Sequence, residues 1–138
     1  MSFPDTVISS SGDGNTTLFV SDQCSTLRVI RDGWIWHVTG PLGGRLGLNG
    51  PRGMISYDWG VIVADFWSNR MVALKWIPDV DQSSARLIPF QTEGCPLSRP
   101  HCLAQHPRSR DLWICDESGL RLVVIKNAII ESFINQFS

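Results

Sequence analysis

The sequence contains few lysines, and its charges nearly cancel. Ten of its 12 basic residues are arginine, the lysines are Lys75 and Lys126, and the formal net charge is −1. Binding of a nucleic-acid backbone usually needs a broad basic surface, so the composition argues against a nucleic-acid partner. Planar guanidinium groups suit localised, bidentate contacts. We therefore expect separate arginine sites and no diffuse cationic face.

Long apolar runs are also missing. No stretch approaches the roughly 18 apolar residues that span a bilayer, and residues 1–11 lack the basic start and apolar core of a signal peptide. These features predict a soluble, cytoplasmic protein with no membrane partner. In that setting the four cysteines, Cys24, Cys95, Cys102 and Cys115, are expected to be reduced thiols and not a disulfide framework.

Familiar catalytic and cofactor motifs are absent as well. The sequence has no Gly-x-Ser-x-Gly, no glycine-rich phosphate loop ending in lysine, no His-Glu-x-x-His and no Cys-x-x-Cys. Cys95, His101, Cys102 and His106 are of metal-binding types, but their spacing matches no structural zinc pattern. The sequence therefore predicts no cofactor and no metal, and it leaves open whether the protein is an enzyme.

One short apolar phrase ending in aspartate occurs three times, as Leu18–Asp22, Val61–Asp65 and Leu112–Asp116. The closing aspartates are 43 and 51 residues apart, a spacing that fits a four-stranded unit of a propeller. We expect these aspartates to accept hydrogen bonds from turn amides and to be structural. Arg70 is predicted to be the internal partner of Asp65.

The segments around each phrase complete a four-stranded pattern. A polar turn and a second apolar run follow each aspartate, as in a hairpin. A proline at position 4, 51 or 100 opens an earlier strand, and β-prone runs at 34–38, 85–90 and 129–134 supply a fourth strand. Residues 128–136 also follow helical spacing, but analogy with the other repeats favours a strand. The sequence thus predicts one all-β domain over 1–138, with three four-stranded antiparallel units at about 4–40, 50–91 and 99–136.

The middle repeat resembles the NHL-repeat family of β-propellers. The resemblance lies in Gly50-Pro51-Arg52-Gly53, Val63-Ala64-Asp65 and Asn69-Arg70-Met71-Val72. The other two repeats keep the aspartate but carry Thr26 and Gly119 where Arg70 stands, and the third carries Cys102 in place of Gly53. The resemblance implies that the three units are propeller blades.

Three blades cannot close a ring, because propellers of this family have about five or six. The resemblance therefore implies a homodimer, in which two half-rings form a six-bladed ring with two-fold symmetry. The sequence also allows the chain to be part of a longer propeller or to pair with a different chain.

The resemblance also indicates where a ligand would bind. In this fold, ligands meet the face that carries the start of each inner strand and the turn between the second and third strands. This rule places Asp5, Arg52 and His101 at the mouth of the central channel. It places four further residues on the surrounding rim, namely Gln23, Phe66, Trp67 and Glu117. The predicted function is a binding or scaffolding module that recognises a protein, peptide or glycan on this face.

Two other functions are compatible with the same residues. The first is a metal-assisted hydrolase or lyase, with Asp5, Arg52 and His101 of two subunits lining a shared channel. The second is RNA binding, with His101 and Trp67 stacking on bases, which the near-zero net charge disfavours. Its basic patch would consist of Arg45, Arg52, Arg99, Arg108 and Arg110.

Overall fold

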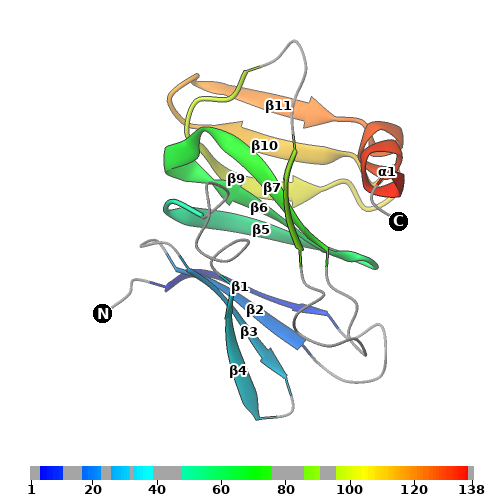
Figure 1. Cartoon of the computed structure of the whole chain (residues 1–138). Helices are drawn as coiled ribbons and strands as arrows, with labels where there is room; N and C mark the ends of the chain where they lie inside the picture. Colours follow the sequence, from blue (N-terminus) through cyan, green and yellow to red (C-terminus); the bar gives the residue numbers. More distant parts are fainter. Residues whose placement is uncertain are drawn as a thin grey trace.

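The chain folds into three antiparallel sheets, shown by a computed structural model that describes residues 4–10, 17–22, 26–31, 33–38, 48–75, 86–90 and 96–136 (Figure 1). Sheet 1 contains β1 (Pro4–Ser10), β2 (Thr17–Asp22), β3 (Thr26–Arg31) and β4 (Trp34–Val38) in that order. Sheet 2 contains β5 (Pro51–Tyr57), β6 (Gly60–Asp65), β7 (Arg70–Lys75) and β8 (Arg86–Phe90). A short 3₁₀ helix, η2 (Phe66–Ser68), joins β6 to β7. Sheet 3 contains β9 (Pro100–Gln105), β10 (Leu112–Asp116) and β11 (Arg121–Ile125).

The predicted all-β class is confirmed in that the described residues form mostly β-strands. The expectation of a fourth strand in the last repeat is wrong, because residues 127–135 form a helix, α1 (Asn127–Asn135). Ile130 and Ile134 lie one turn apart and are buried, while the adjacent Ile129 is exposed. This is the burial pattern of an amphipathic helix. The helix packs its buried side chains into the core that sheets 2 and 3 share.

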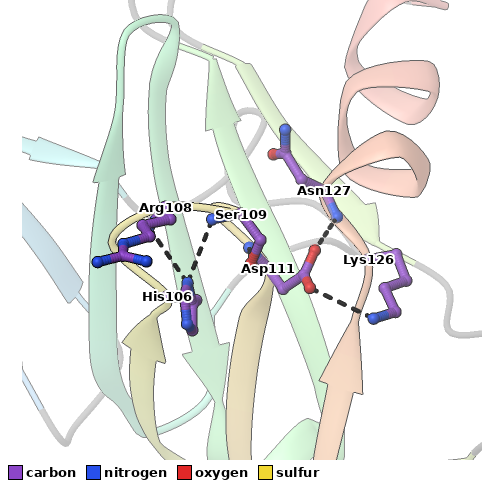
Figure 2. A network of polar contacts seen from close by, with 6 residues as sticks. All are labelled: His106, Arg108, Ser109, Asp111, Lys126 and Asn127. Atoms are coloured by element: carbon purple, nitrogen blue, oxygen red, sulfur yellow. Dashed lines mark hydrogen bonds and ion pairs between the residues drawn. The ribbon is translucent and has the colours of Figure 1, made fainter.

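A polar network holds the first turn of α1 in place (Figure 2). The carboxylate of Asp111 accepts a hydrogen bond from the amide of Asn127 at 2.8 Å, and this bond is the largest cause that lowers the pKa of Asp111 below 3.8. In the turn between β9 and β10, Nδ1 of His106 accepts the amides of Arg108 and Ser109 at 3.1 and 3.2 Å. The two bonds to His106 therefore close the turn, and the bond from Asn127 to Asp111 joins it to the helix.

The three repeats are equivalent in their strand register. The closing aspartate of each repeat stands opposite its opening proline, in the pairs Pro4 with Asp22, Pro51 with Asp65 and Pro100 with Asp116. The register shifts next to the proline in all three. Positions in the second strand can therefore be counted back from the aspartate and compared between sheets.

This count shows which residues face which sheet. Residues two and four before the aspartate of sheet 2, Val63 and Val61, pack against sheet 1, where they meet Phe19. The residue three before it, Ile62, packs against Ile114 of sheet 3. Successive side chains of a strand alternate between its two faces. Sheet 2 therefore buries one face against each neighbour.

The first strands of the three sheets lie side by side, with β5 next to both β1 and β9. β5 and β9 approach each other closely at Gly53. A Cβ atom there would lie against the backbone carbonyl of His101, closer than real Cβ atoms come to other atoms. Glycine at this position is therefore required by the spacing of β5 and β9.

Candidate functional site

The aspartate that closes the middle repeat is a buried anchor. Asp65 is fully buried, and its carboxylate accepts the amide of Asn49 at 2.6 Å and Nε of Arg70 at 3.0 Å. Burial raises the pKa of Asp65 above 3.8, and the bonds from Asn49 and Arg70 oppose that rise. The predicted pairing of Arg70 with Asp65 is confirmed.

The third repeat has the same anchor. Asp116 accepts the amide of Ser98 at 2.7 Å and Nε of Arg121 at 3.0 Å. The sequence comparison that set Gly119 against Arg70 is therefore wrong, because Arg121, five residues after its aspartate, occupies the position of Arg70. Gly119 instead leaves room for the carboxylate, since a Cβ atom there would collide with Asp116. The side chain of Asp22 lies outside the described residues.

The linker residue that each aspartate binds is also bonded to the turn that follows the aspartate. The carbonyl of Asn49 accepts the amide of Trp67 at 3.0 Å, and the carbonyl of Ser98 accepts the amide of Ser118 at 3.0 Å. The linker before each proline is thus bonded through both its amide and its carbonyl. We call this arrangement the linker clamp. It brings the opening residues of β5 and β9 and the turns after β6 and β10 to one end of the sheets.

Five of the seven site residues predicted from the sequence meet at this end, and we call them the aromatic cluster. The guanidinium of Arg52 stacks 4.3 Å from the ring centroid of Phe66. The ring of Phe66 meets the rings of Trp67 and His101 edge-on, with centroids 5.0 and 5.8 Å apart. Nδ1 of His101 lies 3.2 Å from the carboxylate of Glu117. Residues from sheets 2 and 3 therefore form one continuous surface.

The other two predicted residues are not seen in this cluster. Asp5 lies in β1, the strand beside β5, but its side chain is outside the described residues, and so is Gln23. Sheet 1 nevertheless reaches the site through a side-chain hydroxyl. The buried hydroxyl of Ser21 accepts the amide of Thr6 at 3.1 Å and donates to the carbonyl of Arg52 at 2.7 Å. This chain of bonds fixes the backbone at the start of β5.

One further residue belongs to this site, and the sequence interpretation named it only as part of the RNA-binding alternative. The guanidinium of Arg99 stacks 4.7 Å from the ring centroid of Trp67, so it extends the aromatic cluster across the two sheets. Its carbonyl accepts the amide of Glu117 at 3.2 Å. The signal that could have placed Arg99 at this site is its position directly before Pro100, which corresponds to the position of Gly50 before Pro51.

The exposure of the cluster suits recognition of a ligand. Phe66 is buried, but the indole of Trp67 is 50% exposed, and the carboxylate side chain of Glu117 is 53% exposed. Nε of Arg52 is buried and has no hydrogen-bond partner among the described residues. The surface therefore offers an aromatic face, guanidinium donors and one carboxylate.

The described part of the chain contains no group of three or more His, Cys, Asp or Glu residues arranged to hold a metal ion. None of its helices is long and apolar enough to cross a membrane. Comparison of the chain with protein-family models and with curated proteins finds no match. Function is therefore inferred from the geometry of the aromatic cluster and of the sheets.

Proposed function

We propose that the three sheets are successive blades of a propeller, and that the aromatic cluster is a site at which this module recognises a peptide segment of another protein. The observation that carries the proposal is the exposed indole of Trp67, which contacts both the ring of Phe66 and the guanidinium of Arg99. A large exposed aromatic held rigidly loses little conformational entropy on binding. Such residues are typical energetic centres of protein recognition.

The arrangement of the sheets supports the propeller. The first strands β1, β5 and β9 are neighbours, as inner strands around a channel would be, and sheet 2 packs against a sheet on each face. Among the described residues, the sheets at the two ends of the array each have one neighbouring sheet. Their remaining faces are the ones on which a closed ring would place the next blade.

Sheet 3 has an apolar outer face. Trp113 and Cys115, three and one residues before Asp116, are exposed on it, and so are Leu122 and Val124 of β11. By the same count, Phe19 and Ile62 are the counterparts of Trp113, and both are buried against the next sheet. Exposed apolar faces of this kind mark interaction surfaces.

Sheet 1 has the complementary face. Leu18 and Val20, four and two residues before Asp22, correspond to Val61 and Val63, which pack against the preceding sheet. Val7 of β1 is 59% exposed and pairs with Val20 across the strands. The chain therefore presents one face of each kind. A second copy would cover both of them in a two-fold, six-bladed ring.

The solution mass tests the ring. We expect light scattering coupled to size exclusion to give twice the chain mass of 15.4 kDa, and the variant Trp113→Glu to give a single chain because it puts a charge in the interface. Ile129→Glu, which alters an exposed residue on α1, should stay dimeric. A wild-type mass of one chain at all concentrations would contradict the homodimer.

A peptide screen tests the recognition function. We expect the labelled protein to select a subset of peptides from a random-sequence array, and Trp67→Ala to bind that subset at least about tenfold more weakly, which corresponds to about 1.4 kcal/mol. Leu120→Ala, which removes an exposed side chain outside the cluster, should bind as the wild type does. Selection of no peptide, or equal binding by Trp67→Ala, would contradict the proposal.

A further inference from the structure

We infer that the aromatic cluster recognises a carboxylate of an acidic peptide, held by Arg52 and Arg99. This inference rests on the proposed function. It adds the chemistry of the ligand and assigns a binding role to Arg99, which the repeat pattern alone does not indicate.

Both guanidinium groups are presented by aromatic rings. Arg52 stacks on Phe66 and Arg99 stacks on Trp67, and these rings belong to consecutive residues with centroids 5.0 Å apart. A guanidinium over the face of a ring is held there by cation–π attraction and still has N–H donors for bidentate bonds to a carboxylate. The two arginines therefore belong to one site, and a neighbouring aromatic ring holds each guanidinium in the same way.

These arginines differ from the structural ones in the same region. Arg70 and Arg121 are bonded to the buried carboxylates of Asp65 and Asp116, so their charges are already paired. Nε of Arg52 is buried without a hydrogen-bond partner among the described residues. A buried donor left unpaired is unfavourable, because it has lost its water and gained no acceptor. A ligand oxygen beside Arg52 would supply that acceptor.

The backbone of Arg99 gives independent support. Arg99 has φ 61, and its counterpart before the preceding proline, Gly50, has φ 69. The left-handed region is free of strain for glycine but is unfavourable for residues that carry a Cβ atom. The amide of Arg99 donates to Oδ1 of Asn69 at 2.9 Å, which holds the strained residue in place. Because the fold accepts glycine at the equivalent position, a role of the arginine side chain explains why strain is present here.

The surrounding charge favours a peptide over a nucleic acid. Glu117 is half exposed next to His101, and its amide is bonded to the carbonyl of Arg99. A phosphate backbone carries a charge on every nucleotide and would bring a further anion close to this carboxylate. A peptide with an isolated acidic residue avoids that repulsion while using both arginines.

The test uses pairs of peptides. From the array-selected set, each peptide that contains Asp or Glu is compared with its Asn or Gln counterpart by fluorescence polarisation, with a single-stranded RNA as a further probe. We expect the wild type to bind the acidic member at least about tenfold more tightly. Arg99→Gly should reduce that preference to less than about threefold, and its melting temperature should equal or exceed that of the wild type because it relieves the strain at φ 61.

The controls separate this inference from the proposed function. Arg108→Ala removes one positive charge from the turn at the other end of β9 and should leave the preference unchanged. Equal binding of acidic and amide peptides would overturn the carboxylate site while leaving peptide recognition intact. Tighter binding of RNA than of every peptide would overturn it as well. Binding of no peptide at all would instead contradict the proposed function.

Discussion

Replacing Gly53 by alanine is expected to lower the free energy of unfolding by about 3 kcal/mol, at the upper end of the cost of overpacking. The added methyl would meet the backbone carbonyl of His101. A backbone atom cannot move aside as a flexible side chain can. β5 and β9 would have to separate, and separation would loosen the core between sheets 2 and 3 and displace His101 from the aromatic cluster.

Urea unfolding of purified Gly53→Ala, followed by tryptophan fluorescence, would measure this change. Gly33→Ala is the matched control, because a Cβ atom at Gly33 would meet no atom within 4 Å. Its φ of +79 should still cost about 1 kcal/mol. If the two variants lost the same stability, the close approach of β5 and β9 would not be the cause.

Replacing Asp65 by alanine is expected to cost about 3–5 kcal/mol, as does removal of one partner of a buried ion pair. The change leaves the amide of Asn49 and the guanidinium of Arg70 without their acceptor. The linker clamp of the middle repeat would then open next to Trp67. Asp116→Ala should behave in the same way, because Ser98 and Arg121 bind Asp116 through equivalent atoms.

The stability of the fold is expected to depend on pH through Asp65. Since burial raises the pKa of Asp65 above 3.8, the folded state binds its proton more tightly than the unfolded state does. The contribution of Asp65 to stability is therefore greatest below pH 3.8 and falls as the pH rises through the raised pKa.

A second variant, Asp65→Asn, separates charge from hydrogen bonding. It keeps the acceptor for Asn49 and should cost about half as much as alanine in the same urea experiment.

Ser132→Ala is the control for both variants, because it changes an exposed residue of α1 and should alter the free energy of unfolding by less than about 0.5 kcal/mol. If Asp65→Asn were as unstable as Asp65→Ala, charge pairing with Arg70 would outweigh the bond to Asn49. If Asp65→Ala were as stable as Ser132→Ala, the linker clamp would not support the fold.

The strands were predictable because they leave a clear pattern in the sequence. Three apolar phrases ending in aspartate, each preceded by a proline-led strand, become β1–β2, β5–β6 and β9–β10 with the proline opposite the aspartate. Mapping the repeats onto the fold that the middle repeat resembles assigned five of the predicted site residues to one end of the sheets, namely Arg52, Phe66, Trp67, His101 and Glu117. Their binding role remains a prediction.

The remaining features of the fold and of the site depend on side-chain contacts, which a local sequence pattern does not reveal. The run at 129–134 fits a strand or a helix, and the choice is made by the bond from Asn127 to Asp111 and by the burial of Ile130 against the other sheets. Arg121 was missed because alignment of the turn letters set Gly119 against Arg70. The stacking of Arg99 on Trp67 joins residues of different repeats, which comparison of one repeat with another cannot reveal.

The linker clamp has a consequence for how such a chain can change in length. Its partners in the middle repeat lie between Asn49 and Arg70, and those of the third lie between Ser98 and Arg121. Each set of buried polar bonds is therefore encoded within one contiguous stretch. A whole unit can be duplicated, deleted or moved to the other terminus without leaving any member of a clamp unpaired, so the number of units can vary independently of their internal chemistry.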